Sequence, residues 1–108
     1  MADIKQFEIY WTDLDPTKGS EIQKTRPCVI VSPDIMNDVL KTVIVVPLTR
    51  TIIKWPFRCK LKVNNQEISA ACDQLRAISK ERLGDRVGMM STKEQESIAT
   101  ILTSIFRT

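Results

Sequence analysis

The sequence predicts a mainly β fold, a small antiparallel barrel of five to seven short strands with one α-helix at the C-terminal end. Short runs rich in β-branched residues recur between residues 7 and 90, and turn-forming residues separate them. Residues 92–107 instead carry apolar side chains at helical spacing. The chain has 108 residues, 43% of them hydrophobic, so we expect one domain, 1–108, with a substantial core.

The first predicted strand spans residues 7–14, in which Ile9 and Trp11 share one face. A long loop, residues 13–24, follows it, and Asp15-Pro16 is a turn signal within that loop. The arrangement predicts one amphipathic strand that leads into an irregular, charged segment.

The next predicted strand, residues 28–32, is a continuous apolar run, typical of a strand buried on both faces. Pro27 has no N–H and suits the first position of that strand. One helical turn fits residues 33–40. The strand at 42–49 is rich in β-branched residues, and Pro47 near its end indicates an edge or a bulge.

A basic loop, residues 50–55, leads into a strand at 57–63 that alternates cleanly between apolar and basic residues. Asn64-Asn65 then predicts a hairpin turn, because asparagine tolerates positive φ. Three further short strands are predicted at 68–72, 74–79 and 85–90.

The C-terminal helix has a start signal and an apolar face. Ser91 and Glu94 have the spacing of a capping box. Five apolar residues then recur at helical spacing: Ile98, Ile101, Leu102, Ile105 and Phe106. The pattern predicts a helix over 92–107 that packs this face on the barrel or on a partner.

Charge and composition restrict the chemistry. The net charge of +3 is a mild excess that permits a nucleic-acid partner, and residues 50–62 hold five basic residues and no acidic one. The sequence contains no histidine, which excludes Ser-His-Asp and Cys-His catalysis, imidazole acid–base chemistry and most zinc sites. No CxxC pair is present either. We therefore expect no metal ion and no other cofactor.

The three cysteines are Cys28, Cys59 and Cys72, an odd number. The first residues show no basic stretch followed by an apolar one, so we expect reduced, buried thiols in a cytoplasmic protein. No apolar run approaches the roughly 18 residues needed to span a bilayer, so we expect no membrane segment.

Three blocks of sequence, in this order and spacing, resemble the MazF/PemK toxin family. They are IYWTDLDPTKGSEIQKTRPCVIVS at 9–32, VVPLT at 45–49 and ACDQLRAISKERLG at 71–84. The first block is the specific one, since a glycine, serine and glutamate followed by K-x-R-P and an apolar strand is hard to reach by chance. The resemblance covers nearly the whole chain.

This resemblance implies a compact SH3-like antiparallel barrel with a C-terminal helix, a homodimer, and the toxin of a type II toxin–antitoxin system. It implies a metal-independent, sequence-specific endoribonuclease in which the ribose 2′-hydroxyl of single-stranded RNA attacks the adjacent phosphate. The products are 2′,3′-cyclic phosphate and 5′-hydroxyl ends. The implied protein partner is an acidic antitoxin of the MazE type that occupies the RNA groove.

The resemblance also implies site residues. Arg26 matches the catalytic arginine of the family, and Thr49 matches the threonine placed beside it. Glu21 matches the acidic residue of the same loop as Arg26. Asp73 matches an aspartate with an acid–base role in some members, although it is also a candidate turn residue.

Two departures from the family matter for the mechanism. Those members that use the aspartate carry histidine where Ser20 stands here and arginine where Ala71 stands here. The acid–base scheme that relies on that arginine is therefore not carried over, and the reaction would depend on Arg26 with Thr49.

The residues themselves leave the proton transfers open. Arg26 can bind phosphate oxygens through two N–H groups, and Thr49 can donate one further hydrogen bond. Glu21 is a candidate base, but a neighbouring Arg26 would lower the pKa of its carboxyl and weaken it. Alternatively, Arg26 acts as electrostatic clamp and acid, and Glu21 orients the 2′-hydroxyl.

RNA binding is expected from the basic loop and its neighbours. An exposed aromatic residue between cations is suited to stack a single-stranded base, and Trp55 has that setting, although it also fits a core or dimer contact. The candidate RNA-binding residues are Lys24, Ser20, Arg50, Lys54, Trp55 and Arg76.

Two other functions compete with RNA cleavage. A toxin of the same fold can act without catalysis by poisoning a protein target such as gyrase, but the ending SIFRT lacks the Trp-Gly-rich terminus of such toxins. The second rival is a non-catalytic RNA-binding module, which predicts RNA affinity without cleavage.

Overall fold

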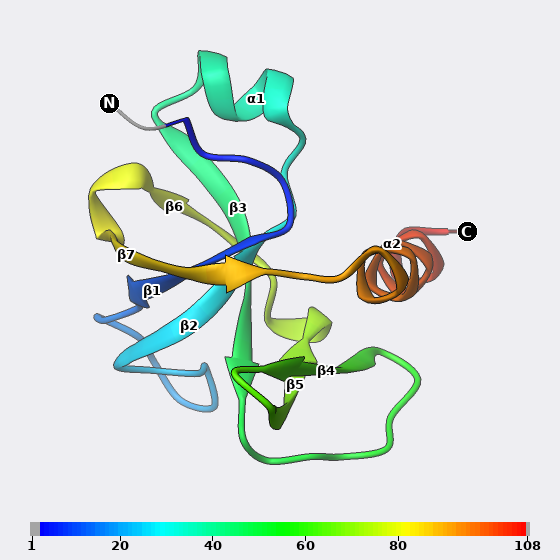
Figure 1. The fold of residues 1–108 in the computed structure, drawn as a ribbon. Coiled ribbons are helices and arrows are strands. Elements are labelled where there is room, and N and C mark those ends of the chain that lie inside the picture. Colours follow the sequence, from blue (N-terminus) through cyan, green and yellow to red (C-terminus); the bar gives the residue numbers. More distant parts are fainter. Residues whose placement is uncertain (1–2, 108) are drawn as a thin grey trace.

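The structure is a computed structural model, and it describes residues 3–107. The predicted domain 1–108 includes residues 1, 2 and 108, which lie outside the described residues. Within the described residues, seven strands and two α-helices follow one another (Figure 1): β1 Glu8–Asp13, β2 Thr25–Ile30, α1 Asp34–Val39, β3 Thr42–Thr49, β4 Arg58–Val63, β5 Gln66–Ala71, β6 Arg76–Ser79, β7 Leu83–Met89 and α2 Thr92–Phe106.

The strands form one antiparallel sheet in the order β4-β5-β3-β2-β1-β7, and β6 pairs with β3 beside this path. The sheet curls into a half-barrel, and α2 lies at one side of it (Figure 1). The predicted mainly β fold with a C-terminal helix is therefore confirmed.

β3 lies inside the sheet, so the edge position, one of the two alternatives (an edge or a bulge) predicted from Pro47, is wrong. On one side, Thr42–Val45 pair with β6, whereas Leu48 and Thr49 pair with β5. Pro47 falls in the gap between these two partners and pairs with Cys28 of β2 on the other side. A residue without an N–H is tolerated here because the strand changes partner at this point.

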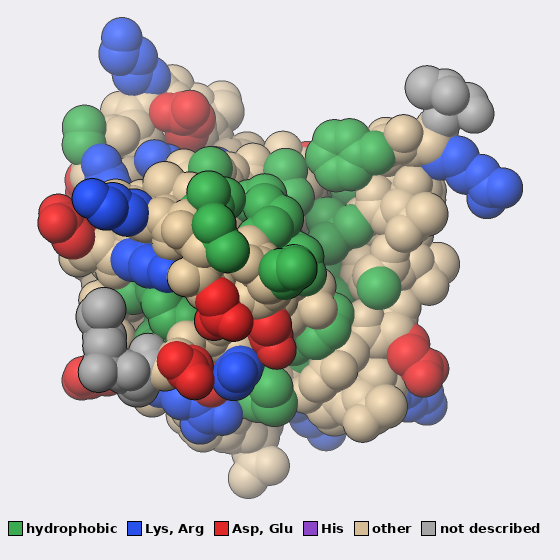
Figure 2. Space-filling view, turned by 90° about the horizontal axis from the view of Figure 1, so that it is seen from above, with side chains coloured by type: hydrophobic (Ala, Val, Ile, Leu, Met, Phe, Trp, Pro, Cys, Tyr) green, Lys and Arg blue, Asp and Glu red, His purple; other side chains and the backbone are tan. Residues whose placement is uncertain are grey.

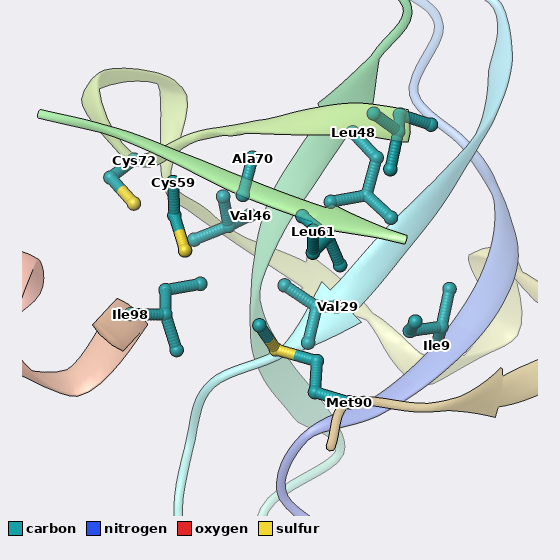
Figure 3. Packing of buried hydrophobic residues seen from close by; sticks show 11 residues of the cluster. Ile9, Val29, Val46, Leu48, Cys59, Leu61, Ala70, Cys72, Met90 and Ile98 are labelled. Carbon is teal, nitrogen blue, oxygen red and sulfur yellow. The ribbon is translucent and has the colours of Figure 1, made fainter. Parts of the chain in front are cut away.

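β2 is buried on both faces, as predicted from its apolar run. Cys28, Val29 and Ile30 are each 0% exposed. Val29 belongs to a cluster with Ile9, Leu48 and Ile98 (Figure 3), whereas the other two belong to a cluster on the opposite face. The strand begins earlier than predicted, at Thr25, and thus includes Pro27, which pairs with Trp11 of β1.

α2 has the predicted capping box. Ser91 Oγ accepts the Glu94 N–H at 3.2 Å, and Glu94 Oε1 accepts the Ser91 N–H at 2.9 Å. The second carboxylate oxygen of Glu94 accepts the backbone N–H of Lys62 at 2.9 Å, which ties the helix to β4. Ile98 is fully buried in the first cluster and Ile101 and Leu102 pack against it, so the first part of the predicted apolar face packs on the sheet. Ile105 and Phe106, at the end of the same face, are exposed.

The predicted hairpin turn joins β4 to β5. Asn64 and Asn65 have φ of 51° and 64°, in the left-handed region that asparagine tolerates, and Val63 pairs with Gln66. The predicted alternation of β4 is also confirmed, since Cys59 and Leu61 are buried while Lys60 and Lys62 are exposed. All three cysteines are buried and unpaired.

Exposed apolar residues gather at the α1 end of the molecule. Figure 2 looks down on this end and shows hydrophobic side chains beside acidic and basic ones. Ile35 and Val39 of α1 are 75% and 76% exposed. α1 precedes the start of β3, so the length of β3 separates this surface from the opposite end of the sheet. Within residues 3–107, no helix is both long and apolar enough to cross a membrane.

Candidate active site

An open cleft of about 440 Å³ lies at the end of the half-barrel where β3 finishes. It is lined by the end of β1, the start of β2, the end of β3 with the residues after it, the β4–β5 hairpin and β7. The lining residues are Trp11, Lys24, Thr25, Arg26, Pro27, Leu48, Thr49, Arg50, Thr51, Val63, Asn64, Gln66, Ile68 and Val87.

The β2–β3 register places Arg26 and Thr49 side by side. Cys28 pairs with Pro47 in this antiparallel ladder. Continuing the register by two residues brings Arg26 opposite Thr49, and opposite residues in a ladder project their side chains to the same face. Both residues line the cleft. The two side chains predicted to carry the reaction are thus neighbours.

The guanidinium of Arg26 is oriented by one hydrogen bond and keeps N–H donors for a ligand. Its Nε donates to the carbonyl of Gln23 at 3.0 Å, which fixes the direction of the side chain. Among residues 3–107, its two terminal nitrogens have no hydrogen-bond or ion-pair partner, and the residue is only half-buried. Four N–H groups therefore remain for an anionic ligand.

Lys24 is held in the cleft by its backbone. Its N–H donates to Asp15 Oδ1 at 3.0 Å, its carbonyl accepts the Leu14 N–H at 3.1 Å, and its φ is 71°. Arg76 supports the same loop, because its Nη1 donates to the carbonyl of Leu14 at 3.1 Å. Arg76 lies outside the cleft lining and anchors the loop that presents Lys24.

The described cleft is electropositive. Lys24, Arg26 and Arg50 line it, and no acidic residue does. Glu21 is exposed and outside the lining, where its Oε1 accepts the Lys18 N–H at 2.5 Å. Ser20 is exposed beside it and also outside the lining. Of the predicted site residues, the structure thus brings together Arg26, Thr49, Lys24 and Arg50, and leaves Glu21 and Ser20 outside the cleft lining.

Asp73 and Trp55 form a separate group. Asp73 lies outside the cleft and accepts two hydrogen bonds from Arg58, at 2.7 and 3.2 Å. Arg58 also lies over the Trp55 ring, 5.1 Å from its centroid, and Phe57 stacks on the same ring at 5.2 Å. Lys54 is exposed in the adjoining loop and does not line the cleft.

The chain matches a known family over nearly its whole length. Residues 5–106 match the family described as PemK-like, MazF-like toxin of type II toxin-antitoxin system. The chain belongs to this family. It is 35% identical to Endoribonuclease MazF9 of Mycobacterium tuberculosis over 101 residues, covering 84% of this chain and 86% of that protein. It is 32% identical to Endoribonuclease toxin MazF of Escherichia coli K12 over 92 residues, covering 84% and 83%.

Solved structures of the family share the fold. MazF of Deinococcus radiodurans superposes with a TM-score of 0.88 at 18% identity, and the match covers 100% of both chains. A MazE–MazF structure from the same organism superposes with a TM-score of 0.80 at 15% identity, covering 99% of this chain and 98% of that one. At these identities the likeness establishes the fold.

Reasoning on the sequence missed several residues of this MazF-like cleft, among them Trp11, Asn64 and Gln66. Trp11 lines the cleft and is 45% exposed, although the predicted alternation of its strand placed it on the same face as Ile9, which is buried. Asn64 and Gln66 line it from the β4–β5 hairpin. The hairpin was predicted, but nothing in its sequence indicates that it closes one side of the cleft. Among residues 3–107, no group of three or more cysteine, aspartate or glutamate side chains is placed to hold a metal ion.

Proposed function

We propose that the protein cleaves single-stranded RNA in this cleft through attack of the ribose 2′-hydroxyl on the adjacent phosphate. The enzyme class follows from relatedness: this MazF-like toxin has relatives at 32% and 35% identity that are endoribonucleases. The proposed reaction path is carried by one observation, the adjacency of Arg26 and Thr49 in an electropositive cleft.

Arg26 is the main catalytic residue. Its terminal N–H groups bind the non-bridging phosphate oxygens, and the charge that develops on those oxygens strengthens the contact in the transition state. The bond from Nε to Gln23 holds the guanidinium in place before RNA arrives, so little reorganisation is needed. One such donor typically contributes about 10²–10³ in rate.

Thr49 donates a hydrogen bond to the same phosphate. Its Oγ1 accepts the Thr51 N–H at 3.3 Å, which leaves the hydroxyl hydrogen free to donate. Lys24 and Arg50 bind the phosphates on either side as point charges. Each is a cleft residue without an ion-pair partner among the described side chains.

The bond changes balance without a metal ion. The 2′-oxygen forms a bond to phosphorus while the bond from phosphorus to O5′ breaks. The 2′-hydroxyl gives one proton to solvent and O5′ takes one from solvent, so the products are a cyclic phosphate and a 5′-hydroxyl. The guanidinium of Arg26 keeps its protons and stabilises the negative charge that develops on the phosphate oxygens and on O5′ in this scheme. Glu21 acts on the loop through Lys18, because no carboxylate lines the described cleft.

The 2′-hydroxyl requirement makes RNA the substrate and excludes DNA. An acidic antitoxin is the expected inhibitor, since its carboxylates would compete with phosphate for Lys24, Arg26 and Arg50. Support for this partner comes from relatives: MazE–MazF structures exist for Deinococcus radiodurans. We further propose that the toxin works in the cytoplasm as a homodimer.

The test is cleavage of a long RNA in the presence of EDTA, with the new ends mapped. We expect internal cuts with cyclic phosphate and 5′-hydroxyl ends. Arg26→Ala should lose at least about 100-fold in rate, and Arg26→Lys should recover only part of it, because lysine lacks the planar pair of donors. Arg107→Ala, at the exposed end of α2, is the matched control and should cut normally.

Circular dichroism and a urea melt show whether each variant is folded. Intact RNA with the wild-type protein would reject the proposal, and so would cutting that EDTA abolishes. RNA binding without cleavage would favour a non-catalytic module. Inhibition of gyrase by a protein that leaves RNA intact would favour a poison of a protein target.

A further inference from the structure

We propose that Trp11 is a base-stacking residue: one unpaired nucleobase lies against its indole on the apolar floor of the cleft, and the amides of Asn64 and Gln66 meet the edge of that base. This inference rests on the proposed RNA-cleaving function. These three residues would recognise the nucleotide next to the phosphate that Arg26 and Thr49 hold. Trp11 takes the stacking role that the sequence suggested for Trp55.

Strand register shows that Trp11 belongs to a continuous apolar surface. Trp11 pairs with Pro27. The β2–β3 register continued by one residue brings Pro27 opposite Leu48, and Leu48 pairs with Ala70 of β5. These residues therefore project to one face, together with Ile68 and Gln66, which follow at steps of two along β5.

This floor lies beside the phosphate site rather than on it. Arg26 and Thr49 project to the other face of the same strands, one position away from Pro27 and Leu48. Both pairs nevertheless line the same cleft, because they lie where β2 begins and β3 ends. A nucleotide whose phosphate contacts Arg26 and Thr49 can therefore place a base over Pro27 and Trp11. The floor has no charge and suits the flat face of a base, whereas the cations at the rim suit phosphate.

An irregularity in the sheet lies at Trp11. β1 and β7 change register between Tyr10 and Thr12, so that Trp11 faces two residues of β7 instead of one. One of the two is Gly84, where an added Cβ would lie 3.3 Å from the Trp11 carbonyl oxygen. The close approach of β7 holds the backbone of Trp11, while the side chain remains 45% exposed.

The amides at the hairpin end have free hydrogen-bonding groups. Within residues 3–107, neither Asn64 nor Gln66 has a side-chain hydrogen-bond partner, and both line the cleft. An amide offers one acceptor and two donors, which matches the donor and acceptor pattern on the edge of an unpaired base. Stacking tolerates any base, so the amides would set which base is accepted.

Trp55 is less suited to this role. It is also 45% exposed, but Phe57 and Arg58 already occupy its ring, at 5.2 Å and 5.1 Å. It lies outside the cleft lining. The two tryptophans of the chain thus form a natural matched pair for an experiment, because either one can be removed while the other reports.

The first experiment uses tryptophan fluorescence and does not need cleavage. Trp55→Phe leaves Trp11 as the sole tryptophan, and Trp11→Phe leaves Trp55. Each variant is titrated with a short single-stranded RNA that carries 2′-O-methyl groups and cannot be cut. We expect strong quenching when Trp11 is the reporter and little when Trp55 is. Equal quenching of both, or quenching of Trp55 alone, would overturn the inference.

The second experiment measures cleavage and its sequence preference. Trp11→Ala should lower kcat/KM by about 5- to 150-fold with an unchanged cleavage motif, Trp11→Phe should retain most activity, and Trp55→Ala should match wild type. Asn64→Gly should relax the motif while Asn65→Gly should not. Both positions have positive φ, which glycine adopts freely, so the turn itself is kept.

The outcomes distinguish failure of the stacking role of Trp11 from failure of the proposed function. If Trp11→Ala cuts as well as wild type while Arg26→Ala does not cut, the inference fails and the proposed function stands. If wild type does not cut, the proposed function fails and the fluorescence titration still decides the role of Trp11. If Trp11→Ala turns a dimer into a monomer in analytical ultracentrifugation, a second copy of this chain covers the floor, and the stacking role is rejected.

Discussion

Arg58 and Asp73 form a two-pronged ion pair, with Nε to Oδ1 at 2.7 Å and Nη2 to Oδ2 at 3.2 Å. The Arg58 side chain is 10% exposed and that of Asp73 is 31% exposed. The pair joins β4 to the 3₁₀ turn Cys72–Gln74 and lies outside the cleft. This geometry favours a structural role for Asp73 over the acid–base role suggested by the family resemblance.

The first prediction follows from that pair. Asp73→Asn should lower the free energy of unfolding by about 1–3 kcal/mol, because a largely buried guanidinium loses a charged partner. RNA cleavage per folded molecule should stay within a few-fold of wild type. The control is Glu67→Gln, whose partner Lys60 is 3.6 Å away and exposed, and its cost should be below about 1 kcal/mol. Loss of cleavage in a folded Asp73→Asn protein would restore the catalytic assignment.

The second prediction concerns the basic residues after β3. Arg50 lines the cleft and Lys54 does not, although both were predicted to bind RNA. Arg50→Gln should therefore weaken RNA binding and reduce the slope of log K against log salt by about 0.7 for one lost phosphate contact. Lys54→Gln should leave the slope unchanged. Binding of an uncleavable RNA at several salt concentrations measures both slopes.

The third prediction uses the buried carboxylate of Glu8, which is 8% exposed. Burial raises its pKa, but hydrogen bonds from the Lys5 N–H, Arg86 and Tyr10 together hold the pKa below its usual value of 4.5. Since the folded pKa is the lower one, the stabilisation is present above the unfolded pKa and is lost as pH falls through the folded pKa. Wild type should therefore lose stability on acidification below about pH 4.5.

Glu8→Gln isolates this contribution from the other carboxyl groups. The variant should be less stable than wild type at neutral pH, and the difference should shrink as the pH falls below about 4.5. Urea unfolding of both proteins across this range gives the two curves. A constant difference at every pH would contradict the assignment of the effect to the charge on Glu8.

The fourth prediction compares the two halves of the capping box of α2. Ser91→Ala removes one acceptor and should cost about 1 kcal/mol. Glu94→Ala should cost more, because Glu94 accepts the N–H of Lys62 as well as that of Ser91. Urea unfolding measures both. Equal costs would mean that the contact between α2 and β4 contributes nothing.

The fifth prediction concerns thiol reactivity. Burial raises the pKa of Cys28 to about 11 and that of Cys72 to about 12, and it also raises the pKa of Cys59. Thiolate is the reactive form, so none of the three should react with iodoacetamide at neutral pH while the protein is folded. Mass spectrometry should show three additions only after unfolding. Rapid labelling of the native protein at any one of them would contradict this.

Local signals in the sequence predicted most elements. Alternation identified β4, the Asn64-Asn65 pair identified the hairpin, and Ser91 with Glu94 identified the start of α2. The edge position predicted from Pro47 was wrong because a strand tolerates a proline wherever its N–H would have no partner, and that depends on which strands pair beside it. That pairing is a property of the sheet, where β3 changes from β6 to β5.

By itself, the sequence determined the order of strands and helix, the family, and the motif that contains Arg26. These depend on side-chain periodicity, turn chemistry and short-range spacing, which neighbouring residues decide. Only the tertiary structure decided which residues share the cleft. It placed Trp11 there instead of Trp55, and it assigned Arg76 to the carbonyl of Leu14, 62 positions away in the chain. Such contacts arise from the curling of the sheet, because the curl brings together segments whose local sequences carry no information about one another.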